Sequence, residues 1–125
     1  MSSAPIQFYK ASSVAHIWLN RPEALNALTR EMLRGLSTAL DEAANDASIR
    51  AILLSGEGRA FCAGDDLKEA AQLFDDNISL RQAREHLDEF QAITRKILAT
   101  PKPVIAAIQG AAVGAGAEIA IACDV

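Results

Sequence analysis

The order of apolar and polar residues predicts strands that alternate with helices along the chain. Short apolar runs rich in β-branched residues are typical of strands, and the predicted strands cover residues 6–10, 14–19, 51–55 and 104–108. Apolar residues that recur every three or four positions share one helix face, and the predicted helices cover residues 30–44, 115–122 and a segment from Ser79 to before Pro101. This alternation indicates an α/β fold with parallel strand pairing.

The sequence also predicts where several of these elements begin. Thr29 precedes the first helix and is a preferred N-cap residue. Ser79 and Gln82 have the spacing of a capping box at the start of the next long helix. The first two strands are close enough in sequence to form a hairpin. Residues 51–55 are largely apolar, which predicts a parallel strand covered by helices on both faces.

A segment of 20 residues, 104–123, contains one charged residue and raises the alternative of a membrane-spanning helix. Gly110 and Gly114 also have the spacing found where membrane helices pair. On the insertion scale its six β-branched apolar residues contribute about −2 to −3.5 kcal/mol, whereas a central carboxylate such as Glu118 costs about +2.5 kcal/mol. These contributions nearly cancel, and the three glycines weaken insertion further, so we expect no membrane span.

The composition describes a single globular domain with an acidic balance. The chain has 125 residues, 50% of them hydrophobic, and 12 Lys and Arg against 16 Asp and Glu give a net charge of −4. Basic residues form no cluster, so nucleic acid is not an expected partner. Cys62 and Cys123 are far apart and no signal peptide is recognisable, which predicts a reduced, cytoplasmic protein. His16 and His86 have no neighbours at metal-ligand spacing, so no metal site is predicted.

Two glycine-rich segments, residues 56–66 and 110–116, each follow a predicted strand and are the main candidates for a binding site. A dinucleotide-binding loop is disfavoured, because Ile119 stands where a third glycine would be and Glu118 would face the pyrophosphate. A Walker phosphate loop is excluded, because no lysine follows Gly116. The two loops are therefore expected to have a function other than binding a dinucleotide or a nucleotide phosphate.

The same loops suit the stabilisation of an oxyanion by backbone N–H groups. Unpaired N–H groups at a helix N-terminus and in a glycine-rich turn can point together at a developing negative charge. Glu118 follows Ala115 by three residues, so both lie on one side of the predicted helix. A carboxylate there is suited to general acid-base catalysis. The alternative is that Glu118 only stabilises the positive end of the helix dipole.

Three stretches in a fixed order resemble the enoyl-CoA hydratase/isomerase family, also called the crotonase family. They are residues 20–28 (NRPEALNAL), residues 61–67 (FCAGDDL), and residues 103–110 (PVIAAIQG) leading to 114–118 (GAGAE). The resemblance covers essentially the whole chain but only about the N-terminal half of a family domain. It implies a crotonase-like α/β fold of strand-strand-helix units, with parallel sheets covered by helices. Residues 1–125 would form the N-terminal part of an acyl-CoA-binding domain that is incomplete at its C-terminus.

The resemblance also implies roles for individual residues. The thioester oxygen of an acyl-CoA would bind between the backbone N–H groups of Ala63 and Ala115; many relatives have glycine at the latter position, but alanine still provides the N–H. Glu118 matches the first of two catalytic glutamates, and the second is expected after Val125. Coenzyme A enters as part of the substrate, so no separate cofactor is expected. Its arm would lie along one turn, and the further substrate contacts implied are Gly64, Asp65, Asp66 and Leu67.

The activity implied by the resemblance is hydration of a trans-2-enoyl-CoA to a 3-hydroxyacyl-CoA. Isomerisation of the double bond, hydrolysis of the thioester and carbon-carbon cleavage are alternatives, because all build negative charge on the same thioester oxygen. A non-catalytic module that retains the acyl-CoA fold is a further alternative, against which Glu118 argues. Family members usually assemble as trimers or pairs of trimers, so a homo-oligomer is expected for a full-length protein.

Overall fold

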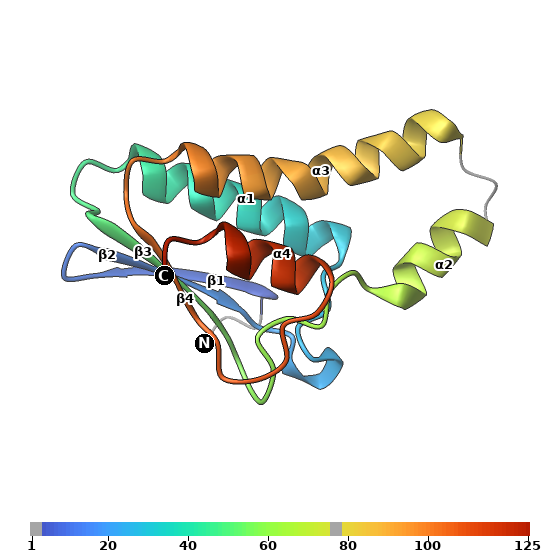
Figure 1. Cartoon of the computed structure of the whole chain (residues 1–125), viewed down its shortest axis with the longest axis horizontal. Helices are drawn as coiled ribbons and strands as arrows, with labels where there is room; N and C mark the ends of the chain where they lie inside the picture. Colours follow the sequence, from blue (N-terminus) through green and yellow to red (C-terminus); the bar gives the residue numbers. More distant parts are fainter. Residues whose placement is uncertain (1–3, 76–78) are drawn as a thin grey trace.

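The computed structural model describes residues 4–75 and 79–125 of the chain. Four strands form a sheet in this part: β1 (Ile6–Ala11), β2 (Val14–Leu19), β3 (Ala51–Gly56) and β4 (Val104–Ala107). The helices are the 3-10 helix η1 (Pro22–Ala24), α1 (Arg30–Asn45), α2 (Leu67–Asp75), α3 (Leu80–Ala99) and α4 (Ala115–Ala122) (Figure 1). Every predicted strand and helix is present, and the predicted ends differ from the observed ones by at most one residue.

The strands lie side by side in the order β1-β2-β3-β4. β1 and β2 pair antiparallel, and the turn between them places Ser12 and Ser13 at φ values of 50° and 69°. β2 and β3 are parallel, as are β3 and β4. Parallel neighbours need a crossover connection, which α1 provides for the first pair and α2 with α3 for the second. The predicted hairpin and parallel pairing are confirmed.

Both predicted helix caps are confirmed. The Thr29 hydroxyl accepts a hydrogen bond of 3.2 Å from the Met32 N–H at the start of α1. At the start of α3, the Ser79 hydroxyl accepts from the Gln82 N–H while the Gln82 side chain accepts from the Ser79 N–H. These caps form because the first N–H groups of a helix have no acceptor within the helix.

Helix α2 is an element that the sequence pattern did not predict. Its start is marked by Asp66, whose Oδ1 accepts a 2.9 Å hydrogen bond from the Glu69 N–H. An aspartate three residues before a glutamate is a helix-start signal of the same type as the one at Ser79. This spacing in residues 66–69 could have identified the helix. The last residue of the glycine-rich segment, Asp66, thus caps the start of α2.

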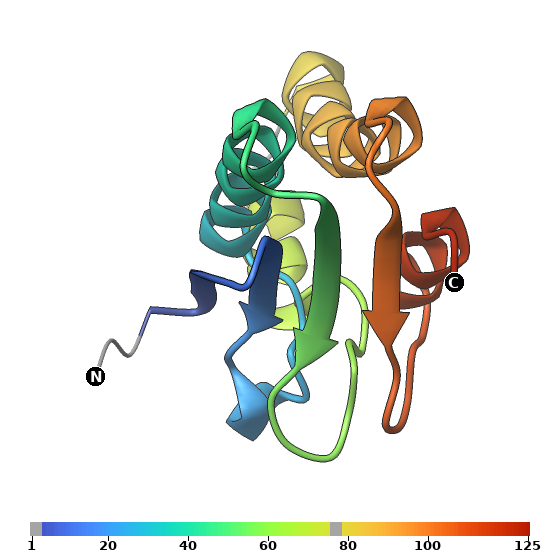
Figure 2. The ribbon, with the colours of Figure 1, turned by 90° about the vertical axis from the view of Figure 1, so that its left-hand side faces the viewer.

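The hydrophobic core lies between one face of the sheet and the helices. Figures 1 and 2 show α1, α3 and α4 on this side of the strands, where α1 packs against α3 and α3 against α4. Alternate residues of each strand point into the core, because successive side chains of a strand face opposite ways. The buried side chains include Ala15, Ile17, Leu19, Ile52, Leu54 and Val104 from the strands and Leu33, Leu36, Ile93, Ile97 and Ile119 from the helices.

The opposite face of the sheet carries an aromatic cluster. Tyr9 and His16 stack at a centroid distance of 4.7 Å, and the Trp18 ring lies 5.0 Å from that of Tyr9. On the same face Leu53 is half-buried and Ile105 is exposed. The prediction that helices cover both faces of strand 51–55 is therefore wrong for the residues that the structure describes, because α1, α3 and α4 all pack on the other side.

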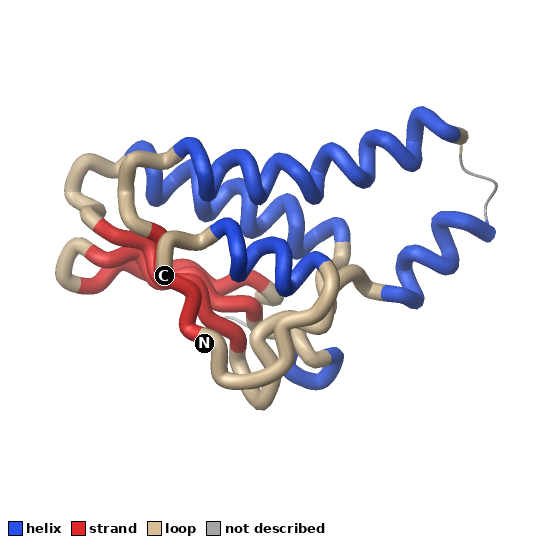
Figure 3. Tube along the Cα trace, in the orientation of Figure 1, coloured by secondary structure: helices blue, strands red, loops and turns tan. Residues whose placement is uncertain are grey.

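The apolar segment 104–123 is divided between three elements. It forms β4, a loop and the eight-residue helix α4. Figure 3 shows this change from strand to loop to helix next to the end of the sheet. Among the described residues, no helix is both long and apolar enough to cross a membrane.

Candidate active site

The two glycine-rich loops meet at one end of the sheet. One loop follows β3 and the other follows β4, and the carboxyl ends of neighbouring parallel strands lie at the same edge (Figure 3). The Cys62 N–H donates to the Ala111 carbonyl at 3.1 Å, and the Val113 N–H donates to the Cys62 carbonyl at 3.0 Å. These bonds hold the two loops together by their backbones.

Glycine allows the loops to approach closely at two positions. A Cβ atom on Gly116 would collide with the carbonyl oxygen of Cys62. Gly64 has a φ of +100°, and a Cβ there would lie 2.9 Å from the Val113 oxygen and 3.6 Å from the Ala115 nitrogen. The first residue of α4 is therefore adjacent to the turn at Gly64, because neither glycine has a side chain.

Residues 20–28 form a third wall, which Asn26 connects to the first loop. The Asn26 side chain is fully buried; its Oδ1 accepts from the Arg21 N–H at 2.8 Å. Its Nδ2 donates to the carbonyls of Glu57 at 2.9 Å and Ala60 at 3.0 Å. Asn26 also has a φ of 58°, a left-handed conformation that asparagine adopts more readily than most residues. Asn26 thus has a structural role in its sequence motif, because its side chain connects residues 20–28 to the first loop.

Gln109 connects the second loop to the first in a similar way. Its Nε2 lies 2.6 Å from the carbonyl of Gly56, 2.8 Å from that of Gly58 and 3.0 Å from that of Ala60. Asn26 and Gln109 thus share the Ala60 carbonyl as an acceptor. Two side-chain amides therefore fix a loop that has no regular secondary structure of its own.

The three segments enclose a cavity of about 660 Å³. All six predicted substrate-binding residues line it; they are Ala63, Gly64, Asp65, Asp66, Leu67 and Ala115. Arg21 and Lys68 also line the cavity, although the sequence interpretation did not include them. Glu118 does not line it: this residue lies on α4, one turn after Ala115, and is exposed.

Backbone N–H groups in the cavity differ in whether they have a partner. The Ala63 N–H donates to the Leu25 carbonyl at 3.0 Å, so its only hydrogen already has an acceptor. This pairing argues against the predicted role of Ala63 as an oxyanion donor. The N–H groups of Asp65 and Ala115, in contrast, have no acceptor among the described residues. Asp65 and Ala115 therefore supply one free donor from each of the two loops.

The direction of the Asp65 N–H follows from the pairing of its neighbours. The Leu28 N–H donates to the Gly64 carbonyl at 2.7 Å, and the Asp66 N–H donates to the Leu28 carbonyl at 2.9 Å. In such a parallel bridge the residue between the two bonded groups directs its own N–H to the other side. The Asp65 N–H thus points away from residues 25–28.

The Asp66 carboxylate holds the surrounding structure together. Its Oδ2 lies 2.7 Å from Arg21 Nη1, and its Oδ1 accepts from the Glu69 N–H. The bond from the Glu69 N–H, with a further contribution from Arg21, lowers the pKa of Asp66 even though burial opposes the shift. Both oxygens of Asp66 are therefore engaged within the protein.

The two thiols do not suit nucleophilic catalysis. Burial raises the pKa of Cys62, which precedes Ala63 directly. Burial, with Asp124 nearby, raises the pKa of Cys123 to about 11. A thiol must lose its proton to become a good nucleophile, so at neutral pH both side chains are neutral.

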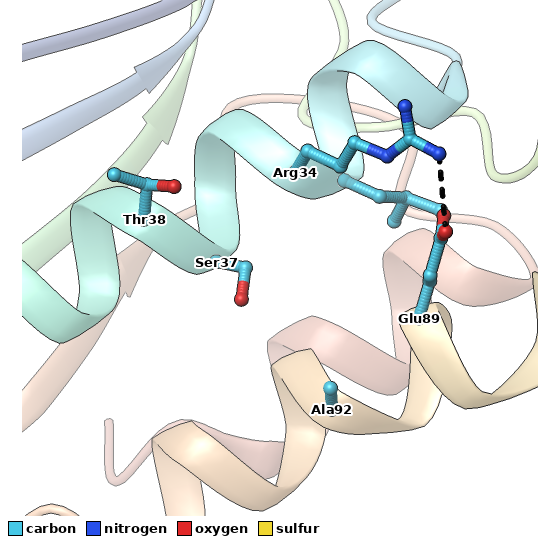
Figure 4. A pocket seen from close by; sticks show the side chains of 6 residues that line it. Arg34, Ser37, Thr38, Glu89 and Ala92 are labelled. Atoms are coloured by element: carbon cyan, nitrogen blue, oxygen red, sulfur yellow. Dashed lines mark hydrogen bonds and ion pairs between the residues drawn. The ribbon is translucent and has the colours of Figure 1, made fainter.

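A second cavity of about 270 Å³ lies between α1 and α3 and is lined by Leu33, Arg34, Ser37, Thr38, Glu89 and Ala92 (Figure 4). Its charged side chains pair with one another, since Glu89 Oε1 lies 3.4 Å from Arg34 Nη2 and 3.1 Å from Arg30 Nη2. None of the predicted site residues lines this space. The candidate active site is therefore the cavity between the loops.

Comparison with known proteins identifies the family. The family model described as enoyl-CoA hydratase/isomerase matches residues 9–125. The chain belongs to this family. It is 41% identical over 125 residues to a Rhodobacter capsulatus protein named "Probable enoyl-CoA hydratase", and the match covers 100% of this chain and 46% of that protein.

Solved structures of this family share the fold. An enoyl-CoA hydratase/isomerase from Xanthobacter autotrophicus Py2 superposes with a TM-score of 0.87 at 38% identity, over 98% of this chain and 45% of that one. An enoyl-CoA hydratase from Bacillus anthracis gives a TM-score of 0.85 at 35% identity, over 97% and 46% of the two chains. The chain thus has a crotonase fold and spans less than half the length of these relatives.

Proposed function

We propose that the protein containing this chain adds water to a trans-2-enoyl-CoA, and that the N–H groups of Asp65 and Ala115 bind the thioester oxygen. The observation that carries this proposal is the presence of two free backbone donors, from two adjacent loops, in one cavity. The membership of the enoyl-CoA hydratase/isomerase family supports it. Coenzyme A enters as part of the substrate and no other cofactor is needed.

The two donors would act on the charge that forms during the reaction. When water adds to the β-carbon, the electrons of the double bond shift toward the thioester and its oxygen becomes negative. Fixed N–H groups stabilise this enolate more than the substrate, and each donor of this kind lowers the barrier by about 2.7 to 4 kcal/mol. The Ala115 N–H also lies at the positive end of the α4 dipole.

Glu118 is the proposed acid-base group. It follows Ala115 by three positions on α4, so the two residues lie on one side of the helix. The Glu118 carboxylate would take a proton from water as the water oxygen bonds to the β-carbon. A protonated glutamate side chain would then give a proton to the α-carbon. The second glutamate expected after Val125 would share this work, and Glu118 is exposed for contact with it.

The substrate's coenzyme A arm would run along residues 63–67. Leu67 is 81% exposed at the edge of the cavity, and Lys68 next to it is an exposed cation. An apolar contact followed by a positive charge suits a ligand whose arm ends in phosphates.

We further propose a cytoplasmic homo-oligomer, a trimer or a pair of trimers, for the full-length protein.

Isomerisation of an enoyl-CoA is the second candidate reaction. It moves a proton between two carbons of the same substrate, which a single carboxylate can do. This chain supplies one carboxylate at the proposed position, Glu118, and the family description includes isomerases. The two reactions give different products, a hydroxyl compound in one case and a shifted double bond in the other.

The test compares wild-type protein, in the longest form its gene encodes, with Glu118→Gln. Hydration of trans-2-butenoyl-CoA is followed by loss of the enoyl absorbance, and products are separated to detect isomerisation. We expect the variant to lower kcat by about 100-fold or more with nearly unchanged affinity for the CoA ester. Glu42→Gln, at an exposed glutamate of α1, is the matched control. Equal turnover of Glu118→Gln and wild type would remove Glu118 from the mechanism.

A further inference from the structure

The side chain of Asp65 is held by a residue outside the cavity. Oδ2 of Asp65 lies 3.3 Å from Nε2 of His86, which belongs to α3. His86 does not line the cavity, and its side chain is only 17% exposed. The His86 ring also has an apolar neighbour, because it meets the Phe90 ring edge-on at a centroid distance of 6.2 Å.

The contact with Asp65 is the one polar interaction of the His86 ring among the described residues. Nδ1 of the ring is buried and has no hydrogen-bond partner there. A buried polar atom without a partner costs free energy, so an apolar ring at this position would suit the packing against Phe90 better. The contact of Nε2 with Asp65 is what distinguishes histidine from such a ring.

Asp65 and Asp66 are consecutive residues held by different parts of the fold. Arg21 and the start of α2 hold the Asp66 carboxylate. The Asp65 carboxylate, in contrast, has His86 as its sole partner in the part of the chain that the structure describes. The N–H that we assign to the oxyanion site is bonded to the Cα atom that carries the Asp65 side chain, and the next residue is held by Arg21 and α2, so the position of this N–H depends on both contacts.

We infer that His86 is a positioning residue, which fixes Asp65 so that the Asp65 N–H stays directed into the cavity. This inference rests on the proposed function for its catalytic consequence. A donor must match the oxyanion position closely, and a displacement of about 1 Å can reduce the rate 100-fold. Loss of the His86 contact would therefore weaken stabilisation of the transition state more than binding of the substrate.

The experiment compares His86→Phe with His86→Gln in the full-length protein. Phenylalanine keeps the ring next to Phe90 but cannot hydrogen-bond Asp65, whereas glutamine keeps a donor. We expect His86→Phe to lower kcat about tenfold with KM changed less than about threefold, and His86→Gln to recover most of kcat. The control is His16→Phe, at the other histidine, which stacks on Tyr9 on the opposite face of the sheet.

Two outcomes would overturn the inference. One is an unchanged kcat in His86→Phe; the other is an equal loss in His86→Phe and His86→Gln, which a general packing role would give. A double-mutant cycle adds a check, because His86→Phe should have little further effect in an Asp65→Ala background, where the N–H remains but the carboxylate is absent.

The same proteins separate this inference from the proposed function. If wild type turns over no enoyl-CoA, the proposed function fails, and amide hydrogen exchange of residues 61–66 still tests His86. Faster exchange in His86→Phe than in wild type and His86→Gln supports the positioning role. Equal exchange in all three proteins overturns it.

Discussion

Single residues decide how the cavity is built, and Asp66 is the clearest case. Its two oxygens hold Arg21 and the first turn of α2, so its charge belongs to the structure around the site. The residue next to it, Asp65, also lines the cavity, and its backbone N–H has no acceptor among the described residues. These neighbouring aspartates differ because the parallel bridge with Leu28 pairs the Asp66 N–H and leaves the Asp65 N–H on the other side.

The lowered pKa of Asp66 predicts how stability depends on pH. The unfolded carboxyl group has the higher pKa, so the unfolded state takes up protons first as the pH falls. The contribution of Asp66 is complete above about pH 4, the ordinary pKa of an aspartate, and is lost as the pH falls through the lowered pKa of the folded state. Asp66→Asn should therefore destabilise the fold near neutral pH and progressively less in acid.

Urea unfolding of the wild type and Asp66→Asn at several pH values measures this effect. We expect a difference of about 1 to 3 kcal/mol near pH 7, since a buried carboxylate loses its charged hydrogen bonds. Asp88→Asn, at an exposed aspartate of α3, is the control. A difference for Asp66→Asn that stays constant into acid would contradict the assigned cause.

At the scale of elements, the two loops depend on connections between segments distant in sequence. Asn26 joins residues 20–28 to the first loop through two donated hydrogen bonds. Asn26→Asp would keep the acceptor for Arg21 but replace the donor with an oxygen that faces two carbonyls. We expect this change to lower the free energy of unfolding by about 1 to 3 kcal/mol or more.

Chemical unfolding monitored by circular dichroism checks the Asn26 prediction. Asn45→Asp, at the exposed last residue of α1, makes the same chemical change outside the loops and serves as the control. If both variants unfold at the same urea concentration as wild type, Asn26 does not connect the segments as described.

The elements of this fold were predictable where the signal was local. Apolar spacing and caps such as Thr29 identify α1 and α3, because these interactions involve neighbours in sequence. Helix α2 was missed, although the spacing of Asp66 and Glu69 contained a usable signal. The half-buried face of strand β3 was also unpredictable, since an apolar run does not say which elements cover it.

The site was predictable as a region but not atom by atom. The glycine-rich segments and the resemblance indicated the residues that line the cavity. The choice between the N–H groups of Ala63 and Asp65 depends on which of them faces Leu25 or Leu28, a property of tertiary pairing. The contact between Asp65 and His86 likewise connects the loop before α2 to helix α3. The two residues are 21 positions apart, so no local pattern predicts the contact.

At the scale of the whole molecule, the sheet's topology determines where chemistry can occur. Parallel β3 and β4 end at one edge, so the loops that follow them meet there (Figure 3). Helix α4 then directs its N-terminus at this meeting point. The chain spans less than half of its relatives' length, and Glu118 is exposed on α4.

The central claim is that the N–H groups of Asp65 and Ala115 bind the thioester oxygen together. A crystal structure of the full-length protein with butanoyl-CoA, which has no double bond to hydrate, tests it most directly. We predict that the thioester oxygen lies within about 3.1 Å of both nitrogens, while the Ala63 N–H keeps its bond to Leu25. An oxygen bound to the Ala63 N–H, or one that contacts neither loop, would contradict the account.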